Sequence, residues 1–300
     1  MAQMQVQFSG ELRGWILHNL QRGCTPADLV DSMVAQHFEP AVAQGLVAAF
    51  VRAHSTGAEP PHDAVTLDLP DAAYRYETPR IAPGTTLRTS DRNVRVALRV
   101  ERPVIVVLDD VLGSDECEQL IAQARPRLTP STIVDPTTGE NTIAEHRNSD
   151  GMFFAPQENA LIARLDRRIA ELMNCPLENG EGLQVLRYGV GAQNTPHFDF
   201  LVPSNAANRD SLARSGQRVS SLVIYLNDVE AGGETVFPEL GLSIAPRRGS
   251  AVYFEYANSA GQVDHASVHA GAPVGAGEKW VATRWMRERR FTPAAATAAY

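Results

Sequence analysis

The C-terminal part of the chain consists of short apolar stretches separated by turn residues, and this pattern restricts the fold more than any other feature. After Gly182 the stretches recur about every ten residues, a spacing typical of all-β domains. Strands are predicted at 183–188, 197–200, 219–226, 242–245, 251–256, 265–270 and 280–287. Many short, evenly spaced strands indicate a β-sandwich or a barrel-like roll.

Helices are predicted on the N-terminal side of this region. Apolar residues recur at helical spacing between 9 and 54, where Thr25–Pro26 has the form of an N-cap followed by proline at the first helical position. Further helices are predicted at 114–124 and 158–173, and Gly57, Pro60 and Pro61 indicate a linker. We therefore expect a mainly β fold with flanking helices: a small N-terminal helical module (1–56), a linker leading into the main domain (57–102), the main domain (103–292) and a tail (293–300).

Composition argues against several classes of protein. The net charge of -8 and the lack of a long basic run argue against nucleic-acid binding. Cys24, Cys117 and Cys175 lie far apart and are odd in number, which argues against a zinc site or a disulfide framework. We find neither a secretory signal nor a stretch long enough to span a bilayer, so we expect a cytoplasmic protein with no membrane partner.

A candidate metal site begins with His197 and Asp199. Residues two apart on a strand point to the same face, so an imidazole and a carboxylate would project together. With a second histidine they would form the facial triad of a non-haem iron(II) site. The spacing alone also fits a surface histidine bonded to an aspartate. The third ligand could be His265 or His269, which lie four residues apart, so strand parity does not separate them.

A candidate anion site lies on the last predicted strand, where Lys279 and Thr283 share one face. Lys279 is the only lysine among 27 basic residues. If arginine serves every other basic position, this one requires a compact ammonium group rather than a planar fork. A lysine and a threonine that point into a barrel would bind a carboxylate by one charge-assisted and one neutral hydrogen bond. The alternative is a lysine on the surface.

Several ordered motifs resemble a known family. They are Y-G-V-G at 188–191, P-H-F-D-F at 196–200, G-G-E-T-V-F-P at 232–238, S-V-H-A-G at 267–271 and G-E-K-W at 277–280. From about Pro103 to Arg290 the chain resembles the prolyl 4-hydroxylase branch of the 2-oxoglutarate/Fe(II)-dependent dioxygenases. This resemblance implies a double-stranded β-helix fold and the hydroxylation of an unactivated C–H bond, with Fe(II), 2-oxoglutarate and O2 as cofactor and cosubstrates and ascorbate as reductant.

The resemblance also implies roles for individual residues. It selects His269 as the third metal ligand, because the family's distal histidine lies ten residues before the lysine that binds the cosubstrate. That lysine corresponds to Lys279, which would bind the distal carboxylate of 2-oxoglutarate. The remaining expectations are Thr283 and Tyr188 near the cosubstrate, and Arg218 and Trp285 at the mouth of the substrate site.

Two departures from the family pattern leave the substrate open. Asn194 stands where the family often has tyrosine, and Arg287 stands where it often has histidine. We expect a prolyl residue in a peptide or protein as substrate. A free amino acid or small natural-product precursor remains an alternative, as does an inactive metal-binding scaffold or sensor. Homodimer formation and the role of the N-terminal helices stay open.

Overall fold

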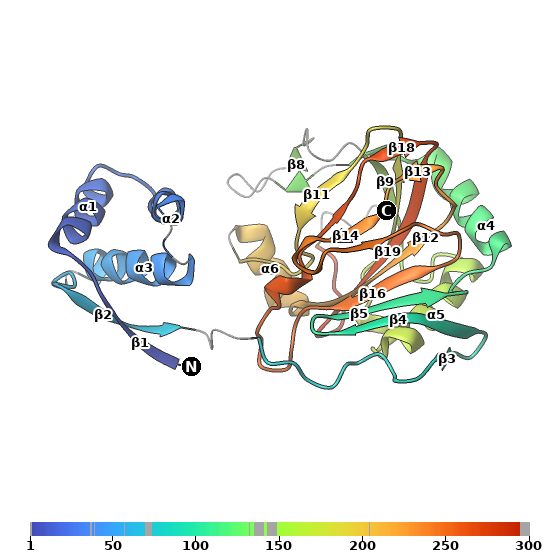
Figure 1. Ribbon diagram of the computed structural model, residues 1–300, viewed down its shortest axis with the longest axis horizontal. Helices are drawn as coiled ribbons and strands as arrows, with labels where there is room; N and C mark the ends of the chain where they lie inside the picture. The colour runs from blue at the N-terminus through green and yellow to red at the C-terminus, as the bar shows by residue number, and fades with distance from the viewer. Residues whose placement is uncertain are drawn as a thin grey trace. The chain divides into compact units, whose positions relative to one another are not determined.

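The structure is a computed structural model of the chain. It describes residues 2–36, 38, 40–56, 58–69, 74–131, 133–134, 141–142, 149–203 and 205–294. The chain forms two compact units, Met1–Tyr74 and Arg75–Tyr300, both drawn in Figure 1. Of the predicted tail at 293–300, residues 295–300 lie outside the described ranges, as does Gly57 at the start of the predicted linker.

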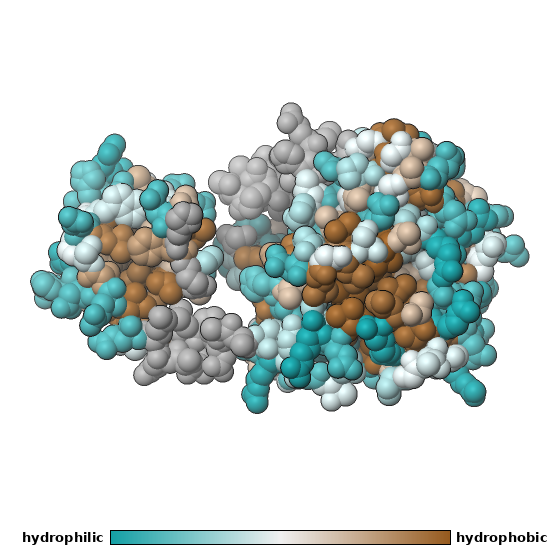
Figure 2. All heavy atoms as spheres, in the orientation of Figure 1, coloured by the Kyte–Doolittle hydropathy of each residue, from teal (hydrophilic) through white to brown (hydrophobic). Residues whose placement is uncertain are grey.

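Among the described residues, the first unit packs three helices and a two-stranded ribbon around its own core. Thr25 caps the second helix in a capping box with Asp28, and Pro26 occupies its first turn, as the sequence predicts. Ile16 and Phe50 are fully buried, and in Figure 2 hydrophilic side chains surround a central apolar group. The elements are β1 (Ala2–Gln7), α1 (Gly10–Gln21), α2 (Pro26–Ala35), α3 (Pro40–Thr56) and β2 (Ala64–Leu69).

The segment at 57–102, which we expected to be a linker, contains three strands. β2 pairs antiparallel with β1 in the first unit, whereas β3 (Thr86–Arg88) and β4 (Asn93–Glu101) belong to the large sheet of the second unit. In β4 the large apolar residues Val94, Val96, Leu98 and Val100 occupy alternate positions, a spacing typical of a β-strand. The boundary between the two units along the chain lies between Tyr74 and Arg75.

In the described part of the second unit, two antiparallel sheets share an apolar core. The larger has nine strands in the order β3-β4-β5-β16-β12-β19-β10-β9-β6, and the smaller has four in the order β11-β17-β14-β15. The other strands of the larger sheet are β5 (Val104–Asp109), β6 (Thr129–Pro130), β9 (Ser149–Phe154), β10 (Leu183–Tyr188), β12 (Arg218–Tyr225), β16 (Ala251–Glu255) and β19 (Lys279–Arg287). Those of the smaller sheet are β11 (Asn194–His197), β14 (Thr235–Phe237), β15 (Leu242–Ile244) and β17 (His269–Gly271). Two short ribbons pair β7 (Ile133–Val134) with β8 (Asn141–Thr142) and β13 (Ala231–Gly232) with β18 (Val274–Ala276).

The large sheet is covered on both faces, because successive residues of a strand point to opposite sides. On one face, Phe254 packs in the same apolar cluster as Phe237 of the smaller sheet. On the other, Val106 packs in a cluster with residues of α4 (Ser114–Ala124) and α5 (Ala160–Met173), which lie along this sheet in Figure 1. The double-stranded β-helix with flanking helices is confirmed.

Five of the predicted strands agree with β10, β12, β15, β16 and β19 to within one residue at each end. Two differ. The strand predicted at 197–200 is β11, which ends at His197, and the one predicted at 265–270 begins only at His269. A short 3-10 helix occupies His265–Ser267 because the Asp264 side chain accepts a hydrogen bond from the Ala266 backbone N–H and caps that turn. No helix in the described ranges has the length and apolarity to cross a membrane.

Candidate active site

Two histidines from distant parts of the chain meet through strand pairing. β11 and β17 are antiparallel neighbours in which His197 lies directly opposite His269, and their ring centroids are 4.3 Å apart. Asp199 lies in the bend after β11. One potential ligand atom from each of the three residues lies within 4.8 Å of the others. The prediction that His197 and Asp199 project from one strand is wrong, because β11 ends at His197. The two side chains nevertheless lie together, as expected.

His265, the alternative third ligand, lies elsewhere. Its ring packs edge-on against Phe198 and Phe200, with centroid separations of 5.2 and 5.5 Å. Among the described residues, the group that could hold a metal ion contains His197, Asp199 and His269 and does not include His265.

Backbone carbonyl groups orient both imidazole rings. His197 Nδ1 lies 2.8 Å from the Thr195 carbonyl oxygen, and His269 Nδ1 lies 3.1 Å from the Ser267 carbonyl oxygen. A carbonyl only accepts hydrogen bonds, so each Nδ1 carries the proton and each Nε2 presents a lone pair. The Asn194 side-chain amide, 3.3 Å from His197 Nε2, can donate to that lone pair.

Asp199 is held as a carboxylate by its neighbours. Its Oδ2 accepts a 2.5 Å hydrogen bond from Ser221 Oγ, and Ser221 Oγ lies 2.9 Å from the Tyr256 hydroxyl. Burial by itself would raise the pKa of Asp199, but electrostatic attraction, chiefly from His269, outweighs it and lowers the pKa to about 2. Burial lowers the pKa of His269 to about 4. At neutral pH the site thus offers a carboxylate and an unprotonated imidazole, the forms that bind metal ions.

This donor set fits iron(II). Two imidazole nitrogens and one carboxylate oxygen, converging from one side, form the facial triad of non-haem iron oxygenases and leave coordination positions open. The carboxylate oxygens each lie 3.7 Å from one histidine Nε2, and His269 is only 5% exposed. When bound, iron(II) would supply the activation of O2 that couples 2-oxoglutarate decarboxylation to substrate hydroxylation.

A buried lysine lies in the same cavity as the three candidate ligands. The cavity has a volume of about 810 Å³ and is lined by Lys279, Val281, Thr283 and Trp285, the alternate residues of one face of β19. Lys279 is 4% exposed, and its Nζ lies 5.6 Å from the Tyr188 ring centroid and 5.7 Å from that of Tyr225. Its Nζ forms no hydrogen bond or ion pair with any residue that the structure describes. Burial lowers its pKa to about 8, so an incoming anion would find a desolvated ammonium group.

Cross-strand pairing groups the other predicted cosubstrate residues around this lysine. Tyr188 lies opposite Lys279 and Gln184 lies opposite Thr283 in the β10–β19 pair. Thr235 lines the same cavity and accepts a 2.7 Å hydrogen bond from the Tyr225 hydroxyl. Neither Thr235 nor Tyr225 was predicted. Thr235 lies inside the G-G-E-T-V-F-P motif, so this motif could have indicated its place at the site.

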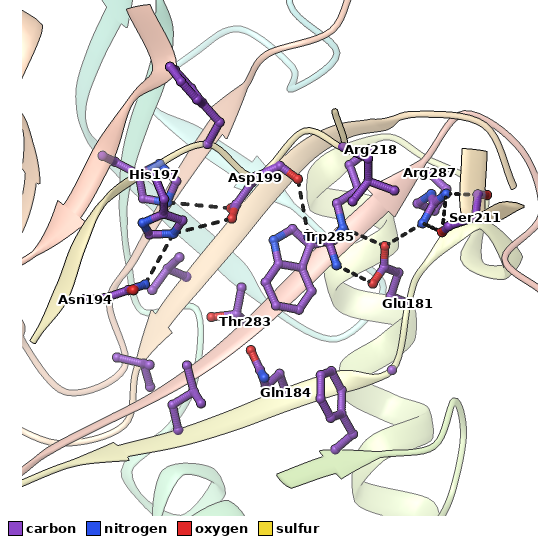
Figure 3. A pocket seen from close by; sticks show the side chains of 18 of the residues that line it. Glu181, Gln184, Asn194, His197, Asp199, Ser211, Arg218, Thr283, Trp285 and Arg287 are labelled. Atoms are coloured by element: carbon purple, nitrogen blue, oxygen red, sulfur yellow. Dashed lines mark hydrogen bonds and ion pairs between the residues drawn. The ribbon is translucent and has the colours of Figure 1, made fainter. Parts of the chain in front are cut away.

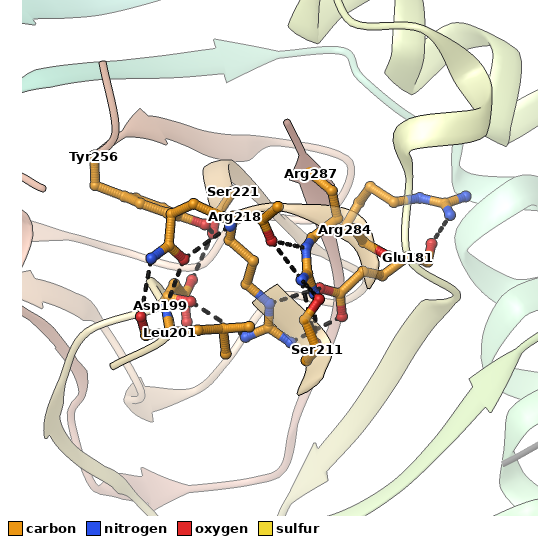
Figure 4. Close-up of polar contacts among 12 residues, drawn as sticks. Glu181, Asp199, Leu201, Ser211, Arg218, Ser221, Tyr256, Arg284 and Arg287 are labelled. Atoms are coloured by element: carbon orange, nitrogen blue, oxygen red, sulfur yellow. Dashed lines mark hydrogen bonds and ion pairs between the residues drawn. The ribbon is translucent and has the colours of Figure 1, made fainter. Parts of the chain in front are cut away.

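Arg218 and Trp285, the two residues that we expected at a substrate mouth, lie together in the lining of the same cavity. The Arg218 guanidinium carbon is 4.2 Å from the Trp285 ring centroid. The same guanidinium donates two hydrogen bonds to Glu181, at 2.7 and 2.8 Å, and one of 3.3 Å to the Asp199 carbonyl. Figures 3 and 4 show these contacts. Arg218 therefore links Trp285 to the backbone of a candidate metal ligand.

Glu181 was not predicted, yet it joins two arginines. Arg287 donates a 3.0 Å hydrogen bond to it and further ones to the Gly216 and Ser211 carbonyl oxygens, at 2.6 and 2.8 Å. Burial alone would raise the pKa of Glu181, but Arg218 and Arg287 hold it below its usual range. Ser211 belongs to α6 (Ala206–Ser215), so Arg287 attaches this helix to the cavity wall. No local sequence signal pairs residues 106 positions apart.

Comparisons with known proteins agree with this geometry. Residues 183–287 match the model of the 2OG-Fe(II) oxygenase superfamily. Prolyl 4-hydroxylase 1 of Arabidopsis thaliana is 41% identical over 212 residues, which are 66% of this chain and 73% of the plant protein. Prolyl 4-hydroxylase subunit alpha-1 of Rattus norvegicus is 37% identical over 63% of this chain, but the match spans only 35% of that subunit. The solved structure of the viral collagen prolyl hydroxylase vCPH from Paramecium Bursaria Chlorella virus-1, with 2OG, is 29% identical, covers 61% of this chain and 95% of that one, and has a TM-score of 0.49.

The matched model and the relatives define the class, the 2-oxoglutarate- and Fe(II)-dependent dioxygenases. The chain belongs to the 2OG-Fe(II) oxygenase superfamily, in its prolyl 4-hydroxylase-like branch. The family-model match begins at residue 183, after the first unit, so it does not bear on the role of the N-terminal helices.

Proposed function

We propose that this enzyme hydroxylates a prolyl residue in a peptide or protein, and that His197, Asp199 and His269 hold the iron while Lys279 binds the distal carboxylate of 2-oxoglutarate. The names of the relatives support the prolyl substrate. The three candidate ligands and Lys279 line one cavity, so metal and cosubstrate would lie side by side. Thr283 and Tyr188 would complete the cosubstrate pocket.

One observation of the cavity favours a peptide. Gln184 Oε1 and Trp285 Nε1 are buried polar atoms without a hydrogen-bond partner among the described residues, and both side chains line the cavity, as Figure 3 shows. A buried polar atom left unpaired costs about 1–3 kcal/mol. A peptide unit carries one N–H and one C=O, and so it could pair with this acceptor and this donor at once.

Each side chain then has a task that follows from its contacts. Asp199 and the two histidines would keep their orientation through Ser221 and the carbonyls of Thr195 and Ser267. Arg218 would hold the Trp285 ring at the edge of the site. The aromatic side chains of Phe153 and Phe198, which line the cavity and are 36% and 37% exposed, would contact apolar parts of the substrate.

The test is mass spectrometry of proline-containing peptides incubated with Fe(II), 2-oxoglutarate and ascorbate, the reductant that we expect the enzyme to use. A gain of one oxygen on proline, with succinate formed in equal amount, would support the proposal. Gain of oxygen on free proline and on no peptide would favour the small-molecule alternative, whose carboxylate would also suit a cavity lined by arginines. Absence of any 2-oxoglutarate turnover would instead favour a metal-binding scaffold.

A further inference from the structure

One face of α6 lines the end of the cavity that would take the substrate. Asn208, Ser211 and Arg214 line the cavity, and their spacing of three residues places them on the same side of the helix. Among the described residues, Arg209 and Asp210 of the same helix do not line it. Residues 291–294 border the same end, where the Ser215 hydroxyl accepts a 3.0 Å hydrogen bond from the Thr292 backbone N–H. A substrate that extends past Trp285 would therefore meet the polar face of α6.

This end of the cavity has an excess of positive charge. Its positively charged lining residues are Arg214, Arg218 and Arg287, and its negatively charged one is Glu181. The remaining charged residues of the lining, Lys279 and Asp199, belong to the proposed cosubstrate and metal sites, where a dianion and a dication would balance them. Three guanidinium groups thus face one carboxylate at the place where substrate enters. Clustered charge of one sign in a cleft raises the local concentration of ligands of the opposite sign.

Arg214 is the arginine whose charge is not used inside the protein. Arg218 and Arg287 both form ion pairs with Glu181, and Arg287 is 2% exposed with its donors directed at protein oxygens. Arg214 forms no ion pair with any described residue, and its one hydrogen bond, from Nε to the Thr292 carbonyl oxygen, is 3.4 Å long. Arg214 is exposed and lines the cavity, and its two terminal amino groups have no partner among the described residues. Two such groups match the geometry of a carboxylate.

We propose that the substrate carries a carboxylate near the target proline and that Arg214 binds it, an inference that rests on the prolyl 4-hydroxylase-like function proposed above. The carboxylate could be an aspartate or glutamate side chain beside the proline, or the C-terminal carboxylate of a chain that ends there. Both sources offer the same bidentate acceptor.

The experiment measures kcat/KM for a matched set of short proline peptides with the whole 300-residue chain. One peptide has glutamate beside the proline and an amidated C-terminus, one is neutral with a free C-terminus, one is neutral and amidated, and one has lysine beside the proline. We expect the best carboxylate peptide to exceed the neutral amidated one about tenfold, as one charge-assisted hydrogen bond would give, or about 1.4 kcal/mol. Which carboxylate peptide leads identifies the source. The preference should fall as salt is added.

The variants test whether Arg214 is responsible. Arg214→Gln should remove the preference for the carboxylate peptide, and Arg214→Glu should reverse it in favour of the lysine peptide. The readout is the ratio between peptides, which a general loss of activity does not change. Arg209→Gln is the matched control, since Arg209 lies on the same helix outside the cavity lining and should keep the preference.

Two outcomes overturn the inference in distinguishable ways. If the acidic, neutral and basic peptides are hydroxylated equally well, or if Arg214→Glu keeps the wild-type order, the carboxylate inference fails while the prolyl function stands. If no peptide is hydroxylated although 2-oxoglutarate is still turned over, the prolyl function fails and the inference fails with it.

Discussion

Replacing Lys279 by alanine should weaken 2-oxoglutarate binding by about two orders of magnitude. Lys279 is 4% exposed, and burial lowers its pKa from 10.5 to about 8. At about 1.4 kcal/mol per pKa unit, that shift means that burial destabilises the ammonium form by about 3 kcal/mol in the empty pocket. A cosubstrate carboxylate would offset this destabilisation, because it would supply the counter-charge that the ammonium group lacks among the described residues. Without the lysine, the carboxylate itself would be buried and unpaired, which costs on the order of 2–5 kcal/mol.

The assay is succinate release as a function of 2-oxoglutarate concentration, at saturating iron and peptide. We expect the apparent KM for 2-oxoglutarate to rise about 100-fold in Lys279→Ala, the equivalent of about 3 kcal/mol. Lys279→Arg should recover only part of the loss, because the planar guanidinium group is larger than the ammonium that it replaces. Thr283→Val should cost less, about 1–3 kcal/mol, since it removes one neutral partner. An unchanged KM in Lys279→Ala would refute the assignment of Lys279 to the cosubstrate.

Three further predictions follow from the same contacts. Burial lowers the pKa of Lys279 to about 8, so its ammonium group is present below this pH and lost above it. The apparent KM for 2-oxoglutarate, measured across pH, should therefore rise by about tenfold per pH unit above pH 8. The Lys279→Arg variant should not show this rise. His269→Ala should reduce 2-oxoglutarate turnover by at least about 100-fold, whereas His265→Ala should keep it, and the opposite result would exchange their roles. A truncated chain beginning at Arg75 should fold and turn over 2-oxoglutarate, because the cavity lining lies wholly within the second unit; an insoluble product or an inactive one would show that the first unit supports the site. A start near Ala58 would instead leave β2 without its partner β1.

Much of the fold could be predicted because its signals are local. The apolar stretch at 183–188 is β10 residue for residue, and Thr25–Pro26 begins α2. The β1–β2 ribbon could not be found in this way, because its two strands lie on either side of the helices and each is defined by the other. In β2, apolar Val65 and Leu67 alternate with polar Thr66 and Asp68, and Leu67 is buried, but nothing in this stretch shows that its partner strand lies beyond three helices.

The candidate site shows the same division between local and distant information. The motifs brought His197, Asp199 and Lys279 to attention, but only strand register, with His197 opposite His269, separates His269 from His265 on structural grounds. Glu181 gave no sequence signal as a single carboxylate between glycines. Only the structure identifies Glu181, through its ion pairs with Arg218 and Arg287, which lie far along the chain.

The central claim is that this chain couples the decarboxylation of 2-oxoglutarate to the hydroxylation of proline at an iron held by His197, Asp199 and His269. The most direct measurement uses isotopically labelled O2 with Fe(II), 2-oxoglutarate and a proline peptide, and determines the label in both products by mass spectrometry. We expect one labelled oxygen atom in succinate and one in the peptide, in equal amounts, and neither in the Asp199→Ala enzyme. Unlabelled products, or labelled products that persist without Asp199, would contradict the proposed site.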